Sequence, residues 1–184
     1  GENRIQYVHS VAPPVSPSKL PEKWKSCPLV LLAPVANEVD VKFAEMFGGA
    51  LLGISVQGWL RQWKSSGKVS PNSLGFLTQI GNAHVVVLSR EDVSPGDHTD
   101  VWFEQVRWPS NDEILVMTEG SRGALVRSKG KIYHVPAFPS VPVDVTGAGD
   151  VFAGAFMVRY KESGDPQVAG LFASAAASLH VELS

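Results

Sequence analysis

Four short runs of branched apolar residues recur along the chain, and more polar segments separate them. The runs cover residues 28–34, 50–56, 84–88 and 113–117. They are nearly continuous in apolar side chains, which is typical of parallel strands that are buried on both faces. The segments 37–47 and 97–108 instead place apolar side chains at helical spacing. Strands that alternate with helices in this way predict βαβ units and a doubly wound sheet.

The N-terminal part of the chain has a different pattern. Residues 3–11 alternate apolar and polar side chains over part of their length, which predicts a half-exposed strand. The following stretch, 12–28, is rich in proline. Proline disfavours helix interiors, so we expect an extended connector there.

The C-terminal part contains a hairpin pattern followed by two helical patterns. Residues 123–135 predict a hairpin that turns at Lys129-Gly130. Residues 151–160 and 165–181 predict two closely packed helices. The second of these begins with Asp165-Pro166, a capping residue followed by a residue suited to the first turn.

Composition narrows the function classes. The 184-residue chain is 44% hydrophobic, which is enough for one well-buried core. Its net charge is -2, and no basic stripe indicates a nucleic-acid partner. No apolar run approaches the roughly 20 residues of a membrane span, so we expect no membrane association. The single cysteine, Cys27, cannot form an internal disulfide, and we expect a cytoplasmic location.

The stretch VDVTGAGDVFAGAF, at 143–156, sets glycines beside an apolar run that otherwise predicts a helix. Glycine costs roughly 1 kcal/mol against alanine inside a helix, so the cluster needs a reason. A P-loop would require lysine where Asp150 stands, and the dinucleotide fingerprint would require glycine at Phe152. What remains is a glycine turn that opens a helix, whose bare backbone amides can bind an anion.

Asp150 follows this turn directly. A carboxylate there could accept the proton of an attacking hydroxyl, as phosphoryl transfer to an alcohol requires. The alternative is a tight loop in which Asp150 only caps the helix.

Two further polar segments follow strands of the predicted sheet. Residues 118–123 come after the strand at 113–117, and residues 88–92 close the strand at 84–88. Ligands of doubly wound folds bind at the carboxyl ends of the strands, so we expect these segments and the glycine turn to converge. The alternative is that the two segments contain only turn and capping residues.

The motif at 144–150 matches the Asp-x-Thr-Gly-Ala-Gly-Asp signature of the carbohydrate kinase family that includes ribokinase, fructokinase and adenosine kinase, and the sequence resembles that family. The resemblance implies that Asp150 is the catalytic base. It implies an anion hole formed by Gly147, Ala148 and Gly149. Asp144 and Thr146 fall where many relatives hold a monovalent cation, usually potassium.

The resemblance also implies a site for the nucleotide and its metal. Thr118, Gly120 and Gly123 match the family's Thr-x-Gly-x-x-Gly nucleotide-binding turn. Relatives usually carry Asn-x-x-Glu after the preceding strand, which organises magnesium and phosphate, whereas this chain has Ser89 and Asp92. Magnesium often keeps its waters, so a contact with Asp92 through water fits the resemblance. Ser89 replaces the amide with a hydroxyl near the phosphates.

Residues 57–63 resemble a segment of some family members. We predict that Arg61 and Gln57 contact a phosphate or a polar substrate. The alternative is a solvated arginine beside core tryptophans.

The family resemblance implies a ribokinase-like fold, a three-layer αβα architecture with a doubly wound, mostly parallel sheet. It covers the later part of that fold, and we expect the chain to be a fragment. Residues 1–12 would end a β lid, 13–27 would form the proline-rich connector, and 28–184 would form the α/β nucleotide-binding core.

The implied activity is transfer of the γ-phosphoryl group of ATP, with Mg²⁺, to a hydroxyl of a sugar, polyol or nucleoside. Relatives are often dimers, so a homodimer is one expected state. Two alternatives stay open: a nucleotide- or sugar-binding relative with a regulatory role, and a dinucleotide-dependent oxidoreductase, which the failed fingerprint disfavours.

Overall fold

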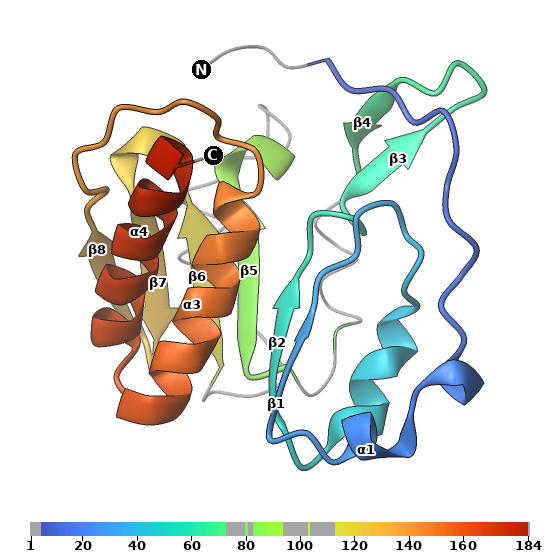
Figure 1. The fold of residues 1–184 in the computed structure, drawn as a ribbon, viewed down its shortest axis with the longest axis horizontal. Coiled ribbons are helices and arrows are strands. Elements are labelled where there is room, and N and C mark those ends of the chain that lie inside the picture. Colours follow the sequence, from blue (N-terminus) through green and yellow to red (C-terminus); the bar gives the residue numbers. More distant parts are fainter. Residues whose placement is uncertain (1–4, 73–79, 81–82, 94–102, 104–112, 184) are drawn as a thin grey trace.

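The computed structural model describes residues 5–72, 80, 83–93, 103 and 113–183. A six-stranded sheet in the order β1-β2-β5-β6-β7-β8 forms its centre (Figure 1). Its strands are β1 (Leu29–Leu32), β2 (Leu51–Ser55), β5 (Val85–Ser89), β6 (Ile114–Thr118), β7 (Ala124–Ser128) and β8 (Lys131–Val135).

The first four of these strands are parallel, and β7 and β8 add to β6 as an antiparallel hairpin. The predicted mostly parallel sheet and the hairpin are therefore confirmed. The hairpin turns at Lys129 and Gly130, which both have positive φ, as a two-residue turn between twisted strands requires. Ser89 and Thr118 are paired in register, so the ends of β5 and β6 lie side by side.

Alternate residues of the strands face opposite layers, because the side chains of a strand point to its two faces in turn. On one face, Val85, Val87, Ile114 and Val116 pack against α3 (Ala148–Ser163) and α4 (Pro166–Leu183). On the other face, Leu52, Ile54, Val86 and Leu88 pack with the 3-10 helix η2 (Val41–Phe47) and with Phe103. Figure 1 shows α3 and α4 side by side over the sheet.

The two C-terminal helices are confirmed, including the predicted cap. The Asp165 carboxylate accepts hydrogen bonds from the amides of Gln167 and Val168 at 2.8 and 3.1 Å. Small residues let α4 lie close to the sheet: a Cβ at Gly170 would stand 2.7 Å from a methyl group of Val135. In the part of the chain that the structure describes, no helix is long and apolar enough to cross a membrane.

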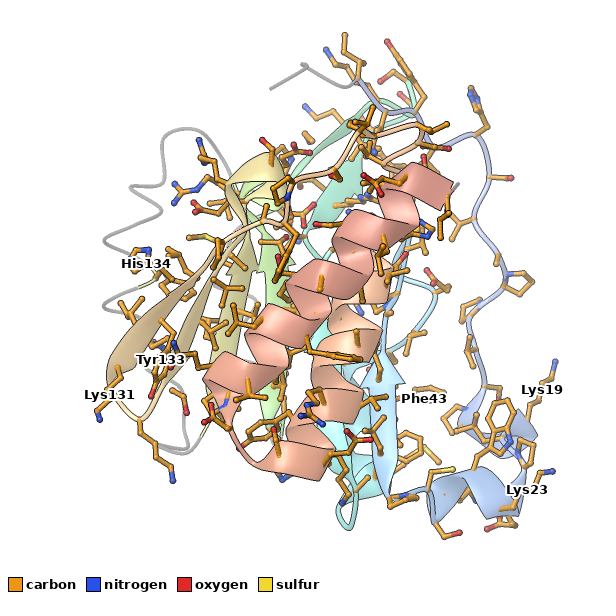
Figure 2. All side chains as sticks on the ribbon, turned by 60° about the vertical axis from the view of Figure 1, so that its left-hand side comes forward. Lys19, Lys23, Phe43, Lys131, Tyr133 and His134 are labelled. Carbon is orange, nitrogen blue, oxygen red and sulfur yellow. The ribbon has the colours of Figure 1, made fainter. Side chains whose placement is uncertain are left out.

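Strand β8 lies at one edge of the sheet, and its labelled side chains are drawn in Figure 2. Lys131 and His134 are exposed there, whereas Tyr133 is half-buried. Polar and charged side chains on an edge strand discourage pairing with the edge of another sheet.

The N-terminal expectations need correction. The strand expected at 3–11 is reduced, among its described residues, to a single antiparallel bridge between Tyr7 and Lys68. The proline-rich connector is not wholly extended, because it contains the 3-10 helix η1 (Pro17–Lys19) and the short helix α1 (Glu22–Lys25). Proline is tolerated at helix starts, and Pro17 and Pro21 stand at those positions.

Three other elements differ from the prediction or extend it. The helix expected at 37–47 is the 3-10 helix η2, which begins only after Asp40. A two-stranded sheet of β3 (Arg61–Trp63) and β4 (Val69–Pro71) was not predicted. The helix expected at 97–108 lies outside the described residues except for Phe103, which is helical and buried.

Glu113 precedes β6, at the opposite end of that strand from Thr118. Its Oε2 atom is buried without a hydrogen-bond partner in the described part of the chain. Burial raises the pKa of the Glu113 carboxyl to about 7, although the Arg127 guanidinium acts to lower it.

We predict that Glu113→Gln stabilises the protein at alkaline pH. The folded-state pKa of about 7 exceeds the ordinary value of 4.5, so the folded chain holds this proton more tightly than the unfolded chain. The contribution of Glu113 is therefore fully present below about pH 4.5 and is lost as pH rises through about 7. Thermal unfolding between pH 4.5 and 8 should show that the stability advantage of Glu113→Gln grows up to about pH 7 and then levels off. The exposed Glu45→Gln is the control, and equal pH profiles for the two variants would contradict the account.

Candidate functional site

The glycine turn and the start of α3 form the first part of the candidate site. Gly147 has a φ of +82°, which favours glycine, and α3 begins at the next residue, Ala148. The first intrahelical bond runs from the Val151 amide to the Gly147 carbonyl, at 2.9 Å. The amides of Gly149 and Asp150 precede that bond and so have no helical carbonyl to donate to. The side chain of Asp150 is exposed in the first helical turn.

The residues just before this turn are held by hydrogen bonds. The Asp144 Oδ1 atom accepts from the Thr146 amide at 2.8 Å, and the Thr146 carbonyl lies 2.8 Å from Nε2 of His180. The Ala148 amide donates to the Val145 carbonyl at 3.3 Å. Oxygens of both predicted cation ligands, Asp144 and Thr146, therefore already accept hydrogen bonds within the protein. The Ala148 amide is also partly committed.

The turn at 118–123 forms the second part. Thr118 ends β6, and its hydroxyl donates to the Leu88 carbonyl on the neighbouring strand, at 3.4 Å. The 3-10 helix η5 (Gly120–Arg122) follows. Gly120 and Gly123 both have positive φ, at 59° and 97°. This conformation explains why glycine occupies both positions.

Gly123 has a second constraint, because it packs directly against the chain that leaves β8. A Cβ at Gly123 would overlap the Val135 carbonyl and stand 2.7 Å from the Ala137 amide nitrogen. At Gly120, in contrast, a Cβ would meet open space.

A cleft of about 340 Å³ joins these two parts. Its walls come from the 118–123 turn, the segment after β8, the start of α3 and the last turns of α4. The lining residues are Ser121, Gly123, Ala137, Phe138, Pro139, Ser140, Ala148, Phe152, Ser174, Ala177, Ser178 and Val181. Two of the three segments that we expected to converge, the 118–123 turn and the glycine turn with the start of α3, thus border one cleft.

Ser89 ends β5 and caps the 3-10 helix η4 (Arg90–Asp92), whose last residue is Asp92. They form a capping box: the Ser89 hydroxyl accepts from the Glu91 amide, and the Ser89 amide donates to the Asp92 carboxylate, both at 3.2 Å. Burial raises the pKa of the Asp92 carboxyl above its ordinary value, while the Ser89 amide, the Arg61 charge and the Gln57 side chain act to lower it.

The two predicted substrate contacts therefore lie against Asp92. The Gln57 side chain and the Arg61 charge are both close enough to Asp92 to lower the pKa of its carboxyl. Arg61 also donates to the Val35 carbonyl at 3.1 Å, while its own carbonyl accepts from Asn37. Arg61 is thus held by protein contacts rather than being freely solvated.

Two groups of predicted residues lie at the carboxyl ends of the neighbouring strands β5 and β6. The Gln57, Arg61 and Asp92 group adjoins the Thr118 turn through the pairing of β5 with β6. That turn shares the cleft with the start of α3. No group of three or more His, Cys, Asp or Glu side chains among the described residues could hold a metal ion by itself.

Comparison with known proteins shows the family of the chain. Residues 88–184, more than half of the chain, match the family described as pfkB family carbohydrate kinase. The chain belongs to the pfkB family.

Two curated relatives match shorter segments of this pfkB-family chain. Ribokinase from Bacillus subtilis is 46% identical over 67 residues, which are 36% of this chain and 23% of the relative. A nucleoside kinase from Methanothermobacter thermautotrophicus is 41% identical over 69 residues, 38% of this chain and 22% of the relative. The matched segments thus span about a quarter of these relatives.

A solved structure shows the extent of the shared fold. A pyrophosphate-dependent kinase in the ribokinase family, solved with sulfate, superposes with a TM-score of 0.76 at 17% identity. The match covers 97% of this chain and 64% of that one. The fold is therefore an incomplete ribokinase-like α/β fold, as predicted.

Sequence reasoning about this pfkB-family chain missed an ion pair between Arg90 of η4 and Glu119, which follows β6. Glu119 Oε1 lies 2.6 Å from Arg90 Nε and 3.7 Å from Arg122 Nη2. The Glu119 side chain is only 14% exposed, and its pairing with Arg90 links the end of β5 to the end of β6. No pattern in the sequence marks Arg90 and Glu119 as partners, because their contact depends on the strand register.

We predict that Gly123→Ala lowers the free energy of unfolding of this pfkB-family chain far more than Gly120→Ala does. Both replacements put a side chain at positive φ, which costs ~1–2 kcal/mol. Only the Cβ at residue 123 also meets backbone atoms, so its cost should exceed about 3 kcal/mol. Chemical denaturation measures the difference, with Gly120→Ala as the matched control. Equal stability of the two variants would show that the contact with the end of β8 is not close.

Proposed function

We propose that this pfkB-family chain provides the phosphate-handling part of a kinase that transfers the γ-phosphoryl group of ATP to an alcohol hydroxyl of a sugar, polyol or nucleoside. The observation that carries the proposal is that Gly123 and Ala148 line the same cleft from opposite sides. One nucleotide could therefore contact the glycine-containing turn and the start of α3 together. Helix starts favour anions through their free amides and their dipole.

The lining of the cleft supports ATP as the phosphoryl donor. Phe138, Pro139, Phe152 and Ala177 contribute apolar surface between the two backbone turns. An apolar wall suits a nucleobase, whereas pyrophosphate, the donor named for the solved neighbour, has no apolar part.

In the proposed reaction, the acceptor oxygen forms a bond to the γ-phosphorus as the bond to the bridging oxygen of ADP breaks. Asp150 accepts the proton of the acceptor hydroxyl. The amides of Gly147 and Gly149 stabilise the charge that develops on the transferred group. The exposed position of Asp150 leaves its carboxylate accessible to an arriving hydroxyl.

The predicted role of Asp92 is compatible with a Mg²⁺ ion that the nucleotide would chiefly hold. Mg²⁺ usually takes only one or two protein carboxylates and completes its shell with phosphates and water. Asp92 fits such a role through water, since its Oδ2 atom is already bonded to the Ser89 amide. When bound, Mg²⁺ neutralises charge on the phosphates. A potassium ion near Asp144 and Thr146 stays part of the proposal.

The acceptor class rests on the relatives. Their names, ribokinase and nucleoside kinase, favour a sugar or a nucleoside. A cytoplasmic location, where ATP is available, belongs to the same proposal. A nucleotide-binding relative with a regulatory role is the alternative outcome of the test below.

We predict that Asp150→Asn abolishes acceptor-dependent ADP formation while ATP still binds. Asparagine has the same shape but cannot take the proton, and loss of a general base costs roughly 10²–10⁴-fold in rate. Turnover is measured against sugars, polyols and nucleosides, and binding is measured by calorimetry. Asp165→Asn is the matched control, because Asp165 also stands at a helix start but caps α4.

Two outcomes would count against this proposal. Near-wild-type turnover of Asp150→Asn would remove the base assignment. ATP binding by the wild type without a phosphorylated product from any acceptor would favour the regulatory alternative.

A further inference from the structure

The segment that leads into the glycine turn has little apolar packing. Val141 and Val143 are 79% and 73% exposed, and every residue from 141 to 146 is exposed. Burial therefore cannot fix the path of this segment. Its position must depend on hydrogen bonds.

Three consecutive residues in the last turn of α4 supply these bonds. The Val181 carbonyl accepts from the Val143 amide at 2.7 Å, and the Glu182 carboxylate accepts from the Val141 amide at 2.9 Å. The third is His180, whose Nε2 lies 2.8 Å from the Thr146 carbonyl oxygen. A carbonyl can only accept, so Nε2 of His180 carries the proton of this bond.

The bond from His180 acts on one particular peptide unit. The Thr146 carbonyl and the Gly147 N–H belong to the same planar, trans peptide, in which they point in opposite directions. Fixing the carbonyl toward His180 therefore fixes the Gly147 N–H away from it. The imidazole also stands very close to Gly147: a Cβ there would lie 3.3 Å from Nε2. Only glycine leaves full room for this approach.

We propose that His180 is a positioning residue for the anion hole, and that it aims the Gly147 amide by holding the Thr146 carbonyl. This inference rests on the proposed function, because the amide is catalytic only if a phosphoryl group binds there. His180 itself does not touch the reacting atoms. Its contribution is to keep one donor in the direction that the transferred group requires.

The test compares two replacements of His180. His180→Gln keeps an N–H donor of similar reach, whereas His180→Phe keeps the bulk and removes the donor. Loss of one such donor costs about 10²–10³-fold in kcat, so a misaimed donor should cost about tenfold or more. We expect this loss in kcat for His180→Phe, with less than about twofold change in the acceptor KM. His180→Gln should stay within about threefold of wild type.

The Gly147 amide gives a second measurement that does not need turnover. In ¹⁵N–¹H spectra, a non-hydrolysable ATP analogue should shift the Gly147 resonance in the wild type and in His180→Gln, and much less in His180→Phe, when each protein is compared with its own ligand-free state. If the phenylalanine ring does not fit, His180→Ala takes its place in the test. It removes the same donor by truncation, and we expect the same loss.

Glu182→Ala is the matched control for general loosening of the segment. It removes the bond to Val141, in the same turn of α4, but leaves the Thr146 carbonyl held. Wild-type kcat in His180→Phe, or equal losses in His180→Phe and His180→Gln, would overturn the inference. Equal losses in His180→Phe and Glu182→Ala would overturn it too. If Asp150→Asn retains turnover, the proposed function fails instead, so the two failures are distinguishable.

Discussion

The candidate site depends on how α4 holds the segment between β8 and α3. This segment, residues 136–147, is mostly exposed and has no strand or helix of its own. Side chains along α4 hold it at successive points: Ser174 donates to the Pro136 carbonyl at 2.6 Å, Ser178 to the Phe138 carbonyl at 3.2 Å, and His180 contacts Thr146. These contacts shape one wall of the cleft and also fix the entry into the glycine turn. A rigid helix thus positions an irregular backbone that burial alone would leave undefined.

Burial does determine where α4 and α3 lie. Phe152, Ala153, Phe156 and Met157 cover one face of the sheet, and Ala169 and Ala173 bring α4 against the same layer. Helix α3 packs on the parallel strands and against α4. Its first turn and the last turns of α4 therefore border the same cleft. Apolar packing therefore fixes the positions of α3 and α4. Hydrogen bonds from α4 then fix the backbone of the polar site.

Much of this could be predicted from the sequence. The runs that became β5 and β6 are nearly continuous in apolar residues, as is typical of strands buried on both faces, and Lys129-Gly130 has the residue types of a two-residue hairpin turn. The glycines of the 118–123 and 144–150 motifs identified both backbone turns of the cleft, because each needs a conformation or an approach that other residues resist. The roles of these residues in catalysis stay predictions.

Other features left no local signal. The strands β3 and β4 have three residues each, too few to show a period, and the prolines near α1 concealed a helix that begins after one of them. His180 is a single histidine in a helix, and its partner lies 34 residues away in the chain. Contacts of this kind depend on tertiary packing and become visible only in the folded molecule.

The central claim is that one nucleotide contacts the 118–123 turn and the start of α3 at the same time. Titration with a non-hydrolysable ATP analogue, followed by the backbone amide resonances, tests it most directly. The account predicts that the resonances of Gly123, Gly147, Gly149 and Asp150 shift together, with one dissociation constant. Saturable binding that shifts the 118–123 turn and leaves residues 147–150 unchanged would contradict it.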